Sequence, residues 1–87
     1  MHKAAAKLPS KDEVLLRFGA AVRSLRDEQD LTQEQLAELS DMHVTYISQI
    51  ERGLKNLSLY NVHRLADALR ISPADFFVAG DSKRTAR

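Results

Sequence analysis

The sequence predicts an all-α fold, a compact bundle of five short helices. Apolar residues recur at spacings of three and four along most of the 87-residue chain, which is typical of helices that bury one face. No stretch alternates apolar and polar residues as a half-buried strand would, and no internal repeat occurs. Five helix-start signals divide the chain, so we expect five helices rather than a few long ones.

The chain opens with residues 1–9, which carry two lysines around an alanine run and end at a proline. We expect this segment to be a flexible arm. Ser10 and Glu13 have the three-residue spacing of a capping box, in which each side chain accepts a hydrogen bond from the other residue's backbone amide. Apolar residues follow at helical spacing, so the first helix is predicted from about Lys11 to Glu28.

Residues 31–53, LTQEQLAELSDMHVTYISQIERG, describe two short helices joined by a tight turn. Thr32 begins a second capping box, and His43 is the expected N-cap of the second of these helices. The turn falls at Asp41, since aspartate tolerates the left-handed region better than most residues. Gly53 is the expected left-handed residue after the second helix. This order of elements is a helix-turn-helix, whose second helix lies in the major groove of DNA.

The third helix of the chain has one apolar and one polar face. Ile47 and Ile50 are expected to face inward. Thr45 and Gln49 lie four residues apart on the other face, where a threonine offers a hydroxyl and a methyl group and a glutamine pairs with adenine through two hydrogen bonds. The outward residues are expected to be Val44, Thr45, Ser48 and Gln49. The apolar stripe of the second helix is expected to be Leu36, Ala37 and Leu39.

A fourth and a fifth helix follow. Ser58 is the predicted N-cap of the fourth. Its buried face is predicted to consist of Val62, Leu65, Ala66 and Leu69. Ser72 and Pro73 stand at an N-cap and at the first helical position, a strong start signal for a fifth helix that should end near Val78. We expect residues 80–87 to form a flexible basic tail.

Composition limits the function classes. The 87 residues suffice for one domain, which we place at residues 10–79. The chain has no cysteine and its histidines lack a second ligand at helical spacing, so we expect no metal site. It has neither a long apolar run nor the apolar core of a signal peptide, so we expect a cytoplasmic protein. Because the net charge is only +1, a nucleic-acid partner has to be inferred from where the charges lie.

The segments TQEQLA, YIS and IERG, and the downstream stretch NLSLYNVHRLADALRISPADFF, resemble the lambda-repressor/Cro-like (Xre) family of DNA-binding proteins. The resemblance covers about residues 14–78, and within the family the chain is most similar to the small controller proteins of restriction–modification systems. It implies a sequence-specific transcriptional regulator that binds double-stranded DNA. Related controllers often carry arginine where this chain has Val44, and the family often has glycine where it has Asp41.

The resemblance also implies roles outside the third helix. Gln33 is expected to contact a phosphate oxygen at the first turn of the second helix, where free N–H groups favour an anion. Arg26 and Glu51 are expected to form a structural ion pair between the first and third helices. Polar residues around the third helix are suited to gripping the sugar–phosphate backbone. The full set expected to contact DNA is Gln33, His43, Val44, Thr45, Ser48, Gln49, Arg52, Lys55 and Asn56.

A single domain of this size buries too little surface for tight specific binding. We therefore expect a homodimer that reads a palindromic operator with half-sites about 34 Å apart. The third helix must stay free for DNA, so the expected interface lies in the C-terminal part. Its residues are Leu69, Ile71, Phe76, Phe77 and Val78. One of the two phenylalanines is expected to close the monomer core instead.

Two other functions fit the same bundle. An antitoxin of similar fold would bind a toxin protein, and a protein-interaction module would reuse the bundle without DNA. An enzyme is a more distant alternative, because no nucleophile motif and no glycine-rich phosphate loop occurs. We therefore expect no cofactor and no small-molecule substrate.

Overall fold

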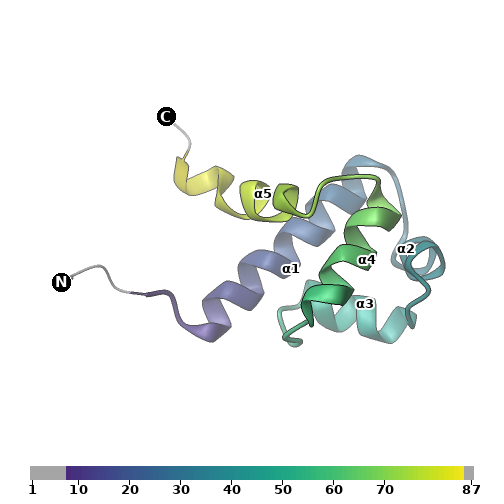
Figure 1. Cartoon of the computed structure of the whole chain (residues 1–87), viewed down its shortest axis with the longest axis horizontal. Coiled ribbons are helices and arrows are strands. Elements are labelled where there is room, and N and C mark those ends of the chain that lie inside the picture. Colours follow the sequence, from purple (N-terminus) through teal and green to yellow (C-terminus); the bar gives the residue numbers. More distant parts are fainter. Residues whose placement is uncertain (1–7, 86–87) are drawn as a thin grey trace.

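The computed structural model describes residues 8–85, which form five α-helices and no strand (Figure 1). The helices are α1 (Lys11–Glu28), α2 (Gln33–Ser40), α3 (Val44–Glu51), α4 (Leu59–Leu69) and α5 (Ala74–Thr85). The predicted all-α, five-helix fold is confirmed. The predicted arm at residues 1–9 lies mostly outside the described residues.

The first four helices begin where their capping residues predicted. The hydroxyl of Ser10 accepts from the amide of Glu13 at 3.1 Å, and the amide of Ser10 donates to the Glu13 carboxylate at 2.9 Å. Thr32 and Gln35 form the same reciprocal pair at 3.0 and 2.8 Å. The hydroxyl of Ser58 accepts a hydrogen bond from the backbone amide of Asn61 at 3.1 Å. Each start is therefore set by contacts within one helical turn.

The helices pack around one core. α1 runs between α5 on one side and the group α2, α3 and α4 on the other (Figure 1). α1 packs against α5 and α3, and α2 packs against α3 and α4. The largest side chains that are completely covered are Val22, Leu36, Ile47, Ile50, Leu65, Leu69 and Phe76. All five helices thus contribute to one hydrophobic core, which holds α3 in place from its inner side.

Two expectations about these elements are wrong. Helix α5 continues to Thr85 instead of ending near Val78, so it enters the segment that we expected to be a flexible tail. Gly80 lies beside the backbone of Arg17, so α5 runs along α1 past the predicted end and gains packing there. Leu39 is 57% exposed and does not belong to the buried face of α2. That face is formed by Leu36, Ala37 and Ser40 instead.

Candidate nucleic-acid interface

The turn between α2 and α3 is built around Asp41. This residue adopts the left-handed conformation, with φ 56° and ψ 45°, and its amide donates to the carbonyls of Ala37 and Glu38. The amide of Met42 also donates to the Ala37 carbonyl, at 2.9 Å. These bonds satisfy the last carbonyls of α2 and redirect the chain within two residues. The predicted left-handed turn at Asp41 is confirmed.

Helix α3 buries one side and presents the other. Ile47 and Ile50 are 0% and 1% exposed, as predicted for the inner face. On the outer face Thr45 is exposed, and Ser48 and Gln49 are partly exposed. Val44 is not turned fully outward as we expected, since it is half-buried and packs against the hydrophobic core. The polar surface of α3 is therefore formed by Thr45, Ser48 and Gln49. Helix α3 itself lies at the edge of the molecule (Figure 1).

His43 caps the start of α3. Its Nδ1 atom accepts from the amide of Thr45 at 3.4 Å, and the residue is exposed. The predicted capping role is confirmed, and the predicted place near DNA stays a prediction.

Exposed polar residues follow the end of α3. Arg52 is the C-cap, and Gly53 after it has φ 77°, the left-handed conformation that the sequence predicted. The amide of Leu54 donates to the carbonyl of Gln49 at 2.9 Å, which ties this corner to the helix. Arg52, Lys55 and Asn56 are all exposed. The loop after α3 thus presents two exposed cations, Arg52 and Lys55, which are suited to a phosphate backbone. Asn56 lies further round, where it lines a pocket with Val14 and Phe77.

A buried ion pair joins α1 to the end of α3. The Nε and Nη2 groups of Arg26 donate to the two carboxylate oxygens of Glu51 at 2.7 and 2.9 Å. The Nη1 group donates to the carbonyl of Leu31, just before α2, at 2.7 Å. The hydrogen bonds and the negative charge of Glu51, with a smaller effect of Asp27, raise the pKa of Arg26 against the opposing effect of burial. The ion pair that the resemblance implied is therefore present, and Arg26 ties α1 to α3 and to the loop before α2.

Gln33 belongs to the same cluster. Its amide nitrogen donates to Oε1 of Glu51 at 3.0 Å, so the first turn of α2 is joined to the last turn of α3. Gln33 is half-buried, and an amide nitrogen has two N–H groups, of which this contact uses one. Bracing of α3 by Gln33 is thus visible in the structure, while its contact with a phosphate stays a prediction.

Two supports of α3 were missed by sequence reasoning. The backbone of α1 at Gly19 lies against the end of α3, and the side chain of Arg64 in α4 reaches the turn after α2. A glycine inside a helical pattern does signal a possible close approach, and Gly19 is such a case. No local pattern indicates the reach of Arg64, because its acceptors are 23 and 24 residues away in the sequence.

The residues predicted for the dimer interface divide into two groups. Leu69 is 0% exposed in the monomer, so its assignment to the interface is wrong. Phe76 is also 0% exposed, so it is the one of the two phenylalanines that closes the monomer core, as we expected of one of them. Both lie in the core where α4 and α5 meet the other helices. Ile71 is half-buried and packs against that core. Phe77 and Val78 are 55% and 69% exposed and stay available to a partner.

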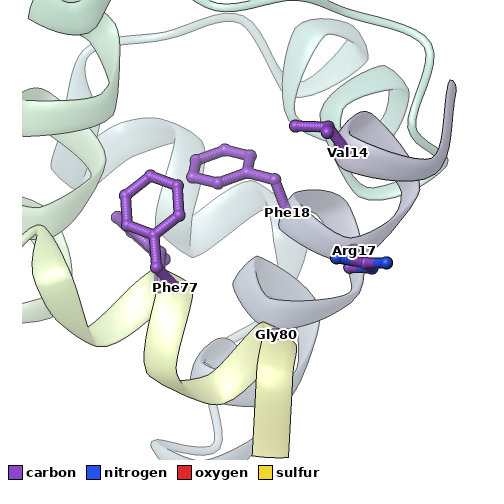
Figure 2. Close-up of a pocket in the computed structure, with 6 residues that line it drawn as sticks. Val14, Arg17, Phe18, Phe77 and Gly80 are labelled. Atoms are coloured by element: carbon purple, nitrogen blue, oxygen red, sulfur yellow. The ribbon is translucent and has the colours of Figure 1, made fainter. Parts of the chain in front are cut away.

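The exposed aromatic lies over the seam between α1 and α5. The ring centroids of Phe18 and Phe77 are 6.0 Å apart, and those of Phe18 and Phe76 are 5.0 Å apart. Figure 2 shows Phe18 and Phe77 approaching each other from the two helices, with Val14 and Gly80 beside them. These residues and Arg17 line a shallow pocket of about 190 Å³. The seam therefore leaves apolar surface open on the monomer.

Residues 8–85 were also searched for metal sites and for membrane-spanning helices. Among them, no group of three or more histidine, aspartate or glutamate side chains is arranged to hold a metal ion. No helix of this part of the chain has the length and apolar character needed to cross a membrane.

Known proteins are similar to this chain in sequence and in fold. A model of the helix-turn-helix family matches residues 22–76. The chain is 43% identical to control protein C.BamHI from Bacillus amyloliquefaciens over 65 residues, which cover 74% of this chain and 80% of that protein. The restriction–modification controller protein C.AhdI from Aeromonas hydrophila has a crystal structure with a TM-score of 0.72 and 44% identity, covering 74% of this chain and 97% of that one. The controller protein C.Esp1396I was crystallised as a tetramer in complex with its natural 35-base-pair operator. That structure matches with a TM-score of 0.74 and 31% identity, covering 80% of this chain and 92% of that one.

The chain belongs to the helix-turn-helix family of sequence-specific, DNA-binding transcriptional regulators. The members that it matches over most of their length include control proteins of restriction–modification systems. Proteins of this family regulate transcription and are not enzymes. The predicted family and its function are therefore confirmed.

Proposed function

We propose that this regulator acts as a homodimer on a palindromic operator and controls the genes of a restriction–modification system in the cytoplasm. The observation that carries the proposal is the outer face of α3, where Thr45, Ser48 and Gln49 are presented while Ile47 and Ile50 anchor the inner face. A helix of this kind at the edge of a small domain fits the major groove. Similarity to C.BamHI and C.AhdI supports the choice of regulated system.

Each predicted contact has a chemical role in this proposal. Thr45 and Gln49 read base edges, since both carry hydrogen-bonding groups on the exposed face. Ser48 contacts a base or a phosphate. Val44, which is partly buried against the core, contacts a thymine methyl group with the part of its side chain that stays exposed. The remaining contacts position the protein on the sugar–phosphate backbone. They are made by Gln33, His43, Arg52, Lys55 and Asn56.

The dimer forms through the exposed part of the seam between α1 and α5. Phe77 and Val78 are the exposed apolar residues of α5, and Val14 of α1 is 43% exposed beside them. A self-complementary contact of two such seams brings together aromatic and aliphatic side chains, which are effective interface anchors. In the alternative function, an antitoxin, a toxin protein would cover the same surface.

Selection of bound sites from random duplex DNA tests the proposal. We expect a motif with two-fold symmetry and half-sites about 34 Å apart, which is one turn of the double helix. Sedimentation of the protein on the selected duplex should give two copies per site or a multiple of two. An asymmetric motif bound by one copy would contradict the dimer, and a co-purifying small protein would favour the antitoxin.

A further inference from the structure

Arg64 of α4 reaches beyond its own helix to the turn between α2 and α3. Its Nη2 group donates to the carbonyl oxygens of Ser40 at 3.0 Å and of Asp41 at 2.5 Å. Ser40 ends α2 and Asp41 is its C-cap, so both oxygens belong to the negative end of the helix dipole. The guanidinium therefore satisfies these carbonyls and also complements their partial charge.

The same guanidinium begins a chain of hydrogen bonds that ends on α3. Its Nη1 group donates to the amide oxygen of Asn61 at 3.2 Å, and the amide nitrogen of Asn61 donates to the hydroxyl of Tyr46 at 3.3 Å. Tyr46 is half-buried on α3, next in sequence to the predicted base reader Thr45. The ring of Tyr60 lies 5.8 Å from the centre of the guanidinium and covers another side of it.

These contacts connect the first half of α3 to α4, whereas the opposite end of α3 is tied to α1 and α2. At that other end, Glu51 accepts from Arg26 and Gln33. An eight-residue helix that is attached at both ends has little freedom to tilt or rotate. Its outer face then needs less ordering when it binds, and its side chains meet base edges in one orientation.

We propose that Arg64 and Asn61 are positioning residues, which hold the turn and the start of α3 in the orientation that reads the operator. The proposal rests on α3 being the reading helix. It assigns to α4 a part in specificity, although neither residue needs to touch a base. A side chain without an N–H donor at position 64 would leave the carbonyls at the end of α2 without this partner.

Three variants separate this role from others. Arg64→Met removes the contact with the turn, whereas Asn61→Ala and Tyr46→Phe break the chain of hydrogen bonds without changing the net charge. Arg23→Met is the matched control, because Arg23 is an exposed cation on α1 whose side chain is 69% exposed. For each variant, affinity is measured on the selected operator and on a scrambled duplex. Hydrogen exchange of the α3 amides is measured on the free protein, and the melting temperature confirms folding.

The role predicts a loss of discrimination. Arg64→Met should lower operator affinity about tenfold or more while changing scrambled-duplex affinity much less. It should also speed amide exchange in α3, and Arg23→Met should do neither. Asn61→Ala and Tyr46→Phe should each lower operator affinity, and the double variant should be no worse than either single one, because both break the same link.

Several outcomes would overturn the proposal. Equal losses on both duplexes, with a weaker salt dependence, would make Arg64 a phosphate contact. A lower melting temperature with unchanged discrimination would show that Arg64 only stabilises the fold. Additive effects of Asn61→Ala and Tyr46→Phe would show that the hydrogen bond between these two side chains does not contribute to operator affinity. If the wild-type protein preferred no duplex at all, the proposed function would fail instead. Amide exchange in α3 would then still test the attachment, because it needs no DNA.

Discussion

Gly19 of α1 lies in direct contact with the carbonyl oxygen of Ile50 in α3. A Cβ atom at position 19 would stand 2.3 Å from that oxygen and 2.9 Å from the carbonyl oxygen of Glu51. Both neighbours are backbone atoms of α3, so they can be displaced only if the helix moves. The absence of a side chain at Gly19 therefore sets how closely α1 and the end of α3 approach each other.

We predict that Gly19→Ala destabilises the protein, since overpacking usually costs about 1–3 kcal/mol and a clash with two backbone oxygens places this site at the upper end. The better helix propensity of alanine, worth about 1 kcal/mol, offsets part of that cost, so the net loss of stability should be about 2 kcal/mol. Gly80→Ala is the matched control in α5, where the nearest atom to the new Cβ is 3.4 Å away. Thermal melts of both variants check the prediction. Equal or higher stability of Gly19→Ala would show that the two backbones are not in contact.

Breaking the ion pair between Arg26 and Glu51 should cost much more than breaking an exposed one. The two side chains are only 10% and 3% exposed, so Glu51→Ala removes the two-pronged partner of a largely buried cation. Arg26 keeps Asp27 at 3.2 Å and the Leu31 carbonyl, so the cost should lie near the lower end of about 3–5 kcal/mol. Arg23→Met breaks the exposed pair of Arg23 with Asp27 and should cost less than about 1 kcal/mol. A double-mutant cycle of Glu51→Ala with Arg26→Met measures the coupling by denaturant titration, and a coupling near zero would contradict the pairing.

The contribution of Arg26 to the free energy of unfolding should not change in the neutral pH range. Its pKa is raised in the folded protein, mainly by the hydrogen bonds to Glu51. A raised pKa gives stability that is fully present below the unfolded pKa and is lost only as the pH rises through the folded one. For an arginine that window lies in strong alkali. Denaturant titrations of wild type and Arg26→Met between neutral and mildly alkaline pH should therefore give a constant difference, and a shrinking difference would contradict this.

Trimming the outer face of α3 should weaken sequence reading. Thr45→Ala or Gln49→Ala should lower operator affinity by about 1–3 kcal/mol and relax the preference at particular base pairs. Lys55→Ala should instead weaken operator and scrambled duplexes alike, since a phosphate contact carries no sequence information. Competition titrations on both duplexes make the comparison. If both α3 variants kept full operator affinity, the reading face would lie elsewhere.

Binding should weaken steeply with salt despite the small net charge of +1. If a dimer neutralises about six to eight phosphates, the logarithm of affinity should fall with the logarithm of salt concentration at a slope of about −5 to −7. A titration series across salt concentrations measures that slope. A slope near zero would mean that the phosphates are not contacted, and it would favour the protein-interaction alternative.

Phe77→Ser should yield a folded monomer with reduced operator affinity. Phe77 is 55% exposed, so the substitution removes little from the core, but a two-fold interface would lose it twice. Phe76→Ser is the contrasting variant, because Phe76 is completely buried and its loss should cost at least about 3–5 kcal/mol of stability. Sedimentation at micromolar concentration, with circular dichroism for folding, tests both. A wild-type protein that stays monomeric while saturating its operator would refute the dimer.

Helix starts and the helix-turn-helix were predictable because their causes are local. The capping box of Ser10, that of Thr32 and the cap at His43 each form within one turn of the chain. The left-handed turn at Asp41 likewise depends on the conformational range of one residue. The contacts of Arg26 with Glu51 were implied by the family pattern rather than by spacing, since 25 residues separate the two.

Local sequence was enough to determine five helices, their starts and the turn between α2 and α3, because capping and turn preferences act over a few residues. Tertiary packing alone decided which of two adjacent phenylalanines is buried, how far α5 extends, and that Val44 packs partly inward. It also decided that Gly19 and Arg64 support α3. These outcomes depend on how helices far apart in the sequence rotate and approach one another, and the periodicity of a single helix does not contain that information.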